Sequence, residues 1–230
     1  MDTNLVAMFS DPAYWESLAR IIPKALNETI YMVIFSTFLA YVLGIPMGVF
    51  LVITSAGHIL PNPWVERTLG TVINIFRSIP FIILMVALIP FTTMIVGTSI
   101  GTTAAIVPLV VSAAPFVARL VESSLREVSP GVIEAALSMG ASPWQIIYKV
   151  LLPEAKSSLI LGVAITTINI IAYTAMAGAV GGGGLGDVAI QYGYNRYRTD
   201  MMIITVLILV VIVQVIQWLG TTLAQKFSHR

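Results

Sequence analysis

Stretches without any charged residue divide this chain into apolar segments long enough to cross a membrane. The first runs from Thr29 to about Thr54. Another, from Ser78 to Ala118, holds 41 residues, which is too long for one span and sufficient for most of two. About 20 apolar residues cross the roughly 30 Å of hydrocarbon in a bilayer. The pattern therefore predicts an all-α protein that crosses a membrane several times.

Five spans account for the pattern. We expect them at residues 29–54, 69–89, 102–121, 157–179 and 201–223, with Pro90 and residues 96–101 forming the turn between the second and the third. An odd number of spans puts the two termini on opposite sides. With the N-terminus outside, eight Lys and Arg residues fall on the inner side and four on the outer side. Because inner loops are richer in these residues, we predict the N-terminus outside and the C-terminus inside.

The two ends of the first span have features of their own. Asp11-Pro12 is a typical helix start, and Tyr14 and Trp15 favour a membrane interface, so residues 1–28 are predicted to form an interfacial segment on the outer face. Residues 29–230 then form the five-span domain. Gly44 and Gly48, on either side of Pro46, have the spacing that allows two helices to approach closely and favour a local kink.

Composition agrees with a membrane protein and excludes several functions. Hydrophobic residues make up 57% of the chain, charged residues 10%, and the mean hydropathy is +0.93. A soluble domain has about 25% charged residues. The net charge of +1 gives no basic footprint for nucleic acid. With no cysteine and only two isolated histidines, His58 and His229, neither a metal site nor a catalytic triad is expected.

The longest hydrophilic stretch, Arg119 to Lys156, carries two helix-start signals. Ser129-Pro130 begins a predicted short helix, and Gly140 ends it. A second start at Ser142-Pro143 leads into Leu151-Leu152-Pro153. The first helix has an apolar stripe, formed by Val132, Ile133, Ala136 and Leu137. Such a helix either rests on the membrane or docks on a partner. Interfacial helices are usually rich in Lys and Arg, and residues 130–141 contain neither, which favours docking.

At these residues the chain resembles the permeases of bacterial ABC importers. Their signature is Glu-Ala-Ala, three residues, Gly, nine residues, Ile, one residue and Leu-Pro. This chain matches it from Glu134 to Pro153 and departs only at Val150, which replaces Ile. The resemblance implies that this loop, residues 119–156, is the coupling helix region that docks on a separate ATPase. The residues implied to take part are Glu134, Ala135, Ala136, Gly140, Leu152 and Pro153.

Other stretches are similar to the methionine-importer permeases in particular. They are residues 74–84, residues 173–186 and Gln191-Tyr192-Gly193-Tyr194. The resemblance implies the type I importer permease fold and import of D- and L-methionine by alternating access across the bacterial inner membrane. The implied partners are a second copy of the chain, two ATPase subunits, an external substrate-binding protein and the lipid bilayer. ATP and Mg are implied to bind the ATPase, so this chain is expected to hold no cofactor and to catalyse no reaction. No phosphate-binding loop motif occurs in it.

Several residues have two interpretations from sequence alone. Arg77 lies within the second predicted span and either has a functional role or reaches the inner interface on its long side chain. Asn169, Tyr173 and Met176 in the fourth span either face a substrate path or only pack between helices. Residues 181–186 match a dinucleotide fingerprint, but a membrane span precedes them, so the glycines are expected to provide a tight turn or a close backbone approach.

Two alternatives to a methionine importer remain open. The first is an ABC permease for another small amino acid, a peptide or an osmolyte. The second is a self-contained channel or ion-coupled carrier, in which buried acids or broken inverted repeats often mark the pathway. The fourth and fifth predicted spans have no acidic residue within their apolar core, and no repeat is visible, which disfavours the carrier.

Overall fold

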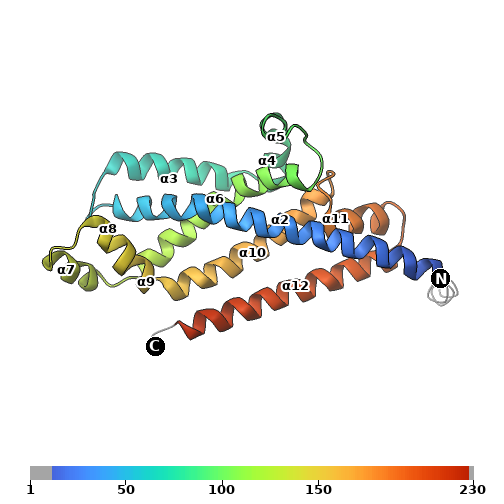
Figure 1. Cartoon of the computed structure of the whole chain (residues 1–230). Coiled ribbons are helices and arrows are strands. Elements are labelled where there is room, and N and C mark those ends of the chain that lie inside the picture. The colour runs from blue at the N-terminus through green and yellow to red at the C-terminus, as the bar shows by residue number, and fades with distance from the viewer. Residues whose placement is uncertain (1–11, 228–230) are drawn as a thin grey trace.

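The computed structural model describes residues 12–227, and every regular element within them is a helix. Long helices run side by side along the molecule, with short helices at both ends (Figure 1). The four that are long and apolar enough to cross a membrane are α2 (Pro12–Ile53), α6 (Thr102–Arg126), α10 (Lys156–Gly178) and α12 (Thr199–Lys226). A bent pair, α3 (Pro63–Ser78) and α4 (Phe81–Ala87), makes a fifth span if it is counted as one.

Short elements connect the long helices. They are α5 (Ile89–Val96), α7 (Pro130–Ser138), α8 (Pro143–Ile146), the π-helix η1 (Ile147–Leu151), α9 (Leu152–Glu154), α11 (Gly184–Val188) and the π-helix η2 (Ala189–Tyr194). We call the end of the molecule that holds α7, α8 and the last turn of α12 the coupling end. The opposite end, with the start of α2 and with α11, is the far end (Figure 1). The first long helix, α2, therefore starts at the far end and the last, α12, finishes at the coupling end, as an odd number of spans requires.

The first helix is longer than predicted. A single helix of 42 residues covers both part of the predicted interfacial segment and the first span, so no break separates residue 28 from residue 29, and Pro23 and Pro46 lie inside it. At about 1.5 Å per residue it is about 63 Å long, twice the thickness of the hydrocarbon layer. Its start packs against α12, where Tyr14 and Leu18 are buried with Met201. The predicted cap, Asp11, lies outside the described residues.

The second predicted span, 69–89, is wrong as a single straight helix. The axes of α3 and α4 differ by 101°. Pro80 lacks an N–H group and disfavours helical backbone at the residue before it, and Ile79 is extended, with φ −85° and ψ 122°. We call residues 79–80 the break. Pro90, expected in a turn, instead lies in the first turn of α5, and the turn is made at residues 97–101.

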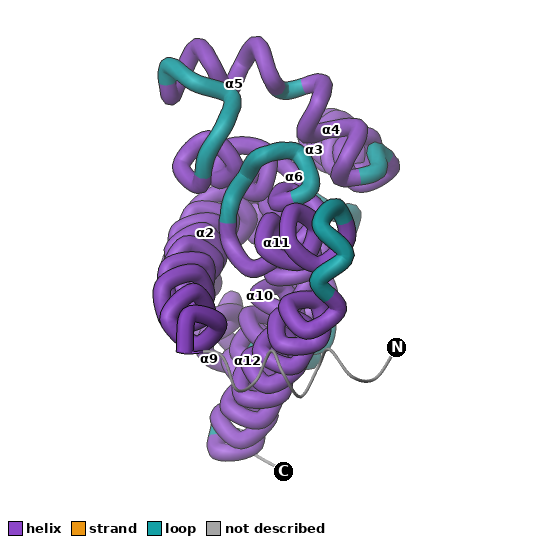
Figure 2. Tube along the Cα trace, turned by 90° about the vertical axis from the view of Figure 1, so that its right-hand side faces the viewer, coloured by secondary structure: helices purple, strands orange, loops and turns teal. Residues whose placement is uncertain are grey.

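Close packing of α2 on α6 forms the centre of the molecule. A Cβ atom on Gly44 would lie 2.6 Å from the side chain of Val117, and one on Gly48 would lie 2.6 Å from the backbone oxygen of Ala118. Only glycine fits at such distances, so the predicted close approach of two helices at this pair is confirmed, and the partner helix is α6. Figure 2 shows α3, α4 and α5 on one side of this centre, and α10 and α12 on the other.

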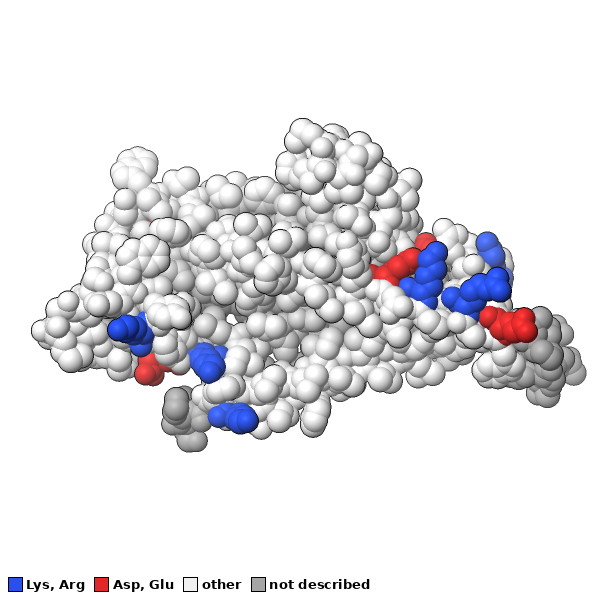
Figure 3. Space-filling model, viewed as in Figure 1, with Lys and Arg blue, Asp and Glu red and all other residues white. Residues whose placement is uncertain are grey.

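Charged side chains mark the two ends of the molecule. On the face drawn in Figure 3, Lys, Arg, Asp and Glu gather toward the coupling end and toward the far end, and the broad zone between them is uncharged. Many large apolar residues of the long helices are exposed, for example Phe38 in α2 at 64% and Val211 in α12 at 61%. An uncharged, apolar face between two charged ends is the surface that a bilayer requires.

Candidate functional site: the coupling loop and the fourth span

The coupling helix forms where the sequence predicts it. Helix α7 begins at Pro130, although the side chain of Ser129 makes no capping hydrogen bond. Its last residue is Ser138, and the chain turns two residues later at Gly140, which has a φ of +79° that favours glycine. The N–H of Ala141 donates to the carbonyl of Ala136 at 3.1 Å, and the N–H of Gly140 donates to that of Leu137 at 2.9 Å. These two bonds satisfy the last carbonyls of the helix and turn the chain sharply.

The second part of the loop is fixed by a capping box. The Ser142 side chain accepts from the Gln145 N–H at 3.4 Å, and the Gln145 side chain accepts from the Ser142 N–H at 2.8 Å. The chain then continues through α8, η1 and α9 into α10 almost without interruption. Leu151 is fully buried and Leu152 packs against the core, whereas Pro153 is exposed. This segment therefore joins the coupling helix to the fourth span as one continuous helical connection.

The two alanines of the signature have different surroundings. Ala136 is buried at 5% exposure against the core of the bundle, and its part in coupling stays a prediction. Ala135 and Glu134 are exposed. A helix that turns one alanine inward and the other outward packs on its own bundle while presenting a small residue to the surface.

Five large apolar side chains are exposed on α7 and on the segment that follows it. They are Val132 (41% exposed), Leu137 (47%), Met139 (82%), Trp144 (77%) and Tyr148 (75%), which we call the coupling surface. The exposure of Met139, Trp144 and Tyr148 was missed from sequence. The helical spacing of 144 and 148, which places both on one face, was the available signal. Aromatic and methionine side chains are enriched at the centre of protein–protein interfaces.

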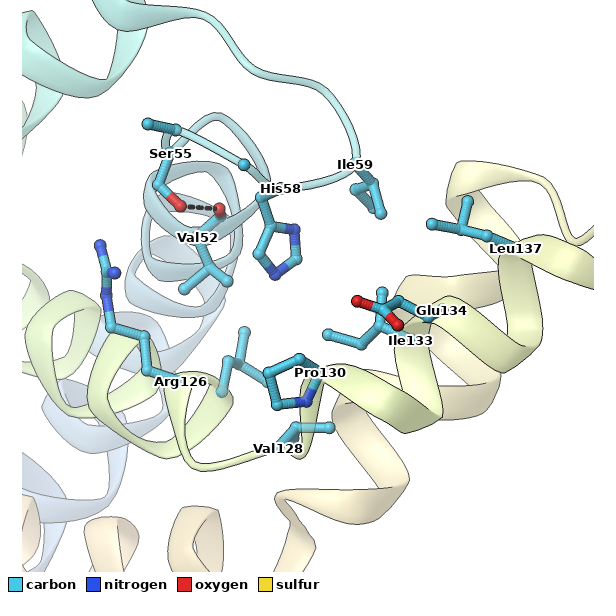
Figure 4. Close-up of a pocket in the computed structure, with 13 residues that line it drawn as sticks. Val52, Ser55, His58, Ile59, Arg126, Val128, Pro130, Ile133, Glu134 and Leu137 are labelled. Carbon is cyan, nitrogen blue, oxygen red and sulfur yellow. Dashed lines mark hydrogen bonds between the residues drawn. The ribbon is translucent and has the colours of Figure 1, made fainter.

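A cavity of about 310 Å³ lies between α7 and the loop that follows α2. Figure 4 shows His58 and Ile59 from the loop opposite Ile133 and Glu134 from α7, with Arg126 nearby. Burial and the charge of Arg126 lower the pKa of His58 below its usual 6.5. His58, which had no role in the sequence interpretation, therefore lines a cavity beside α7 that disfavours its charged form.

The candidate path residues lie on one face of α10. Asn169, Tyr173 and Met176 are spaced by four and three residues, which places them in one row along a helix. Asn169 and Tyr173 are half-buried, and Met176 is 47% exposed. The ring of Tyr173 stacks on Phe81, the first residue of α4, with centroids 4.6 Å apart and planes within 10°. The row therefore faces the side of the bundle where the broken span lies.

Arg77 lies next to the break. It is exposed in the last turn of α3, and α3 begins at the coupling end with Pro63. Fourteen residues separate the two, about 21 Å along the helix axis. An arginine side chain is much shorter than this, so the Arg77 side chain does not extend as far as the start of α3. A functional role and a side chain that reaches the inner interface both stay predictions for Arg77.

The glycine-rich loop closes the far end. Gly184 has a φ of +81°, and its N–H donates to the Glu28 carboxylate at 2.9 Å. The next N–H, of Leu185, donates to the Thr29 hydroxyl at 2.8 Å. A Cβ on Gly186 would clash with the backbone of Ala175. The prediction of a tight turn with close backbone approach is confirmed. No group of three potential metal ligands occurs in residues 12–227.

Comparison with known proteins decides the family. Residues 44–229 match the family described as binding-protein-dependent transport system inner membrane component. The chain belongs to this family. A relative from Vibrio cholerae, named a probable D-methionine transport system permease protein, is 52% identical over 96% of this chain and 99% of its own length. The Escherichia coli K12 D-methionine transport system permease protein is 50% identical over 74% of this chain and 76% of its own.

Solved structures of the family agree with the fold. The inward-facing MetNI methionine ABC transporter, in a native crystal form, superposes with a TM-score of 0.91 at 47% identity, covering 96% of this chain and 100% of the other. An amino acid ABC transporter with histidines superposes at 0.72 with 21% identity, covering 94% of this chain and 98% of the other, which supports the fold alone. The predicted resemblance and the type I importer fold are thereby confirmed. The family name also gives the inner-membrane location in general terms.

Proposed function

We propose that this chain is the membrane-spanning subunit of a bacterial methionine importer and that it works as a homodimer. Each copy docks one ATPase subunit, which binds ATP and Mg, and an external binding protein delivers D- or L-methionine. The chain itself holds no cofactor and catalyses no reaction. In this proposal the coupling end faces the cytoplasm and the far end faces outward. The names of the close relatives support the substrate.

One observation carries the mechanical part of the proposal. The exposed Glu134–Ala135 face of α7, together with the coupling surface, lies between the ends of α6 and α10. A force applied to α7 therefore reaches two spans directly. Only residues 127–129 separate α7 from α6, and the helical segments α8, η1 and α9 lead from the coupling loop into α10. Closure of the two ATPase subunits on ATP draws the two coupling helices together and opens the path outward. Hydrolysis reverses the movement.

An arginine at position 135 tests the docking. Ala135→Arg places a bulky charge on the exposed face of the coupling helix, where it clashes with a docked subunit and loses its hydration. Because Ala135 is exposed, the variant should still fold and insert. We expect ATP-driven uptake of labelled methionine into vesicles to be abolished and the ATPase to copurify poorly. Ala135→Ser, which stays small and uncharged, is the matched control and should keep uptake. Normal uptake by Ala135→Arg would contradict docking at this face.

The substrate is tested in the same vesicles. Labelled L-methionine and D-methionine should accumulate with ATP and the binding protein present. Unlabelled amino acids without a thioether, peptides and osmolytes should not compete at similar concentrations. Uptake of one of these in place of methionine would leave the importer mechanism intact and overturn the substrate.

A further inference from the structure

An arginine inside the third span has no role in the mechanism described so far. Arg119 lies in α6, seven residues before Arg126, and so about 10 Å from the end of that helix. Its side chain is only 25% exposed. A charge at this depth in a membrane is costly unless it is paired, and such residues usually serve a function. Glu122, one turn further along, accepts a hydrogen bond from Arg119 and pairs at 3.0 Å with Arg126.

The remaining contacts of Arg119 lead to a different helix. Its Nη2 donates to the backbone carbonyl of Gly70 at 3.2 Å and to the Oδ1 of Asn74 at 2.9 Å, both on α3. A Cβ placed on Gly70 would lie 3.5 Å from the guanidinium, which is ordinary contact. The planar fork of arginine suits such multiple contacts, which an ammonium group does not reproduce.

The other contact of α3 with the bundle is apolar. Ile73 is the one residue of α3 that is buried, and with the partly buried Leu69 it packs against Leu51 of α2 and Ala118 of α6. Within residues 12–227, the bonds from Arg119 to Gly70 and Asn74 are the side-chain hydrogen bonds that join α3 to α6. A small apolar cluster and one guanidinium therefore hold α3 on α6.

The helix held in this way ends at the break. Beyond it, the first residue of α4 stacks on Tyr173 of α10, one of the candidate path residues. At the other end, α6 leads from Arg126 into the coupling helix at Pro130. A continuous chain of contacts thus runs from the coupling loop through α6, Arg119 and α3 to the break and to the path.

We infer that Arg119 is a positioning residue for transport, which holds α3 on α6 so that the two helices move together. Movement of the coupling loop then reaches the break at residues 79–80 through both helices. The inference rests on the proposed function, because it assumes that the coupling loop drives transport. It concerns residues outside the docking face and outside the path. Loss of the contact uncouples ATP hydrolysis from substrate movement, and the ATPase continues to turn over.

The test uses the complete assembly of permease, ATPase and binding protein in vesicles. Arg119→Met removes the charge and the contacts to α3, and Asn74→Ala removes one of those contacts and leaves every charge in place. We expect uptake to fall about tenfold in Arg119→Met and by a smaller factor in Asn74→Ala, a range typical of coupling between sites, with ATP hydrolysis nearly unchanged in both. The double variant should be no worse than Arg119→Met, because both changes act through the same contact.

Arg67→Gln is the matched control. Arg67 is an exposed arginine on the same helix, so this variant removes a charge from α3 without removing a bond to α6. It should keep its ratio of uptake to hydrolysis. If Arg119→Met does not assemble, Arg119→Lys and Asn74→Ala carry the test, because both retain the charge beside Glu122.

Three results would overturn the inference. In the first, uptake and ATP hydrolysis fall in equal proportion in Arg119→Met. In the second, neither rate changes in that variant. In the third, the ratio of uptake to hydrolysis falls as much in Arg67→Gln as in Asn74→Ala. A purely structural role would lower the thermal midpoint and the yield and leave the ratio of uptake to hydrolysis unchanged. Absence of uptake in the unaltered assembly would instead contradict the proposed function, so the two failures are distinguishable.

Discussion

The contact between α2 and α6 gives the sharpest prediction about how this bundle is held together. In Gly48→Ala, the added Cβ would lie 2.6 Å from the carbonyl oxygen of Ala118 and 2.6 Å from the Cβ of Val121. Ordinary contacts of this kind begin at 3.4 Å, so the two helices must separate by about 0.8 Å or distort locally. Neither neighbouring atom lies at the end of a flexible side chain that could move aside.

Two opposing effects set the size of the change. Overpacking a well-packed site costs typically about 1–3 kcal/mol. Replacing glycine by alanine inside a helix contributes up to about 1 kcal/mol in the opposite direction, through helix propensity. Gly70→Ala isolates the second effect, because its Cβ would meet its nearest neighbours at 3.5 and 3.8 Å, which is ordinary contact. The difference in unfolding free energy between the two variants should therefore be about 1–3 kcal/mol, with Gly48→Ala the less stable.

Tryptophan fluorescence of the detergent-solubilised protein, followed during heating, measures this difference. For a chain of this size each kcal/mol lowers the midpoint by about 2–4 °C. Gly44→Ala, which meets Val117 at 2.6 Å, should behave like Gly48→Ala. Equal midpoints for Gly48→Ala and Gly70→Ala would refute the close approach of the two helices and with it the packing at the centre of the bundle.

Three further predictions concern single side chains. Thr29→Val leaves the N–H of Leu185 without its hydrogen-bond partner, so the free energy of unfolding should fall by about 1–3 kcal/mol, measured as a lower thermal midpoint. Thr37→Val, on the same helix, is the control and should have little effect. The pKa of His58 is lowered in the folded state, so the unfolded chain takes up the proton first as the pH falls, and the free energy of unfolding should decrease below about pH 6.5. Between about pH 7.5 and about pH 5.5, His58→Gln should lose less of this free energy than the unaltered protein. An identical loss in both proteins would contradict this. Met176→Cys adds a single cysteine to a chain that has none, and this exposed side chain should react with a soluble thiol reagent in an ATP-dependent way or crosslink to the second copy. If it does neither and cysteines on another span do, α10 does not line the path.

Much of the fold was predictable because a bilayer leaves few solutions for an apolar chain. Helices α10 and α12 begin and end within a few residues of their predicted positions, and α6 begins at the predicted Thr102. Local chemistry was equally informative where a short motif determines the backbone. Ser-Pro pairs start α7 and α8, with a side-chain cap at α8, and Gly140 turns the chain after α7 through its left-handed conformation.

The sequence failed to predict where an apolar segment bends and where a helix continues through a proline. Hydropathy predicted one span at 69–89 because it counts apolar residues and has no information on direction. The sharp bend arises where Pro80 leaves Ile79 extended, and only the packing of α4 against its neighbours fixes the resulting angle. The unbroken α2 is the converse case, in which two prolines lie inside a helix that continues through both.

What the sequence determined by itself is the class of protein, the positions of its long apolar helices and the local turns of the loop between α6 and α10, because composition, segment length and motif spacing are local properties of the chain. Only the tertiary structure decided which side of each helix meets a neighbour. It turned Ala136 inward and Ala135 outward, and it gave Gly48 its partner on α6. It also brought Arg119 within hydrogen-bond distance of Asn74, which lies 45 residues earlier in the sequence. These relations depend on the rotation and separation of packed helices, and no local pattern along the chain specifies either.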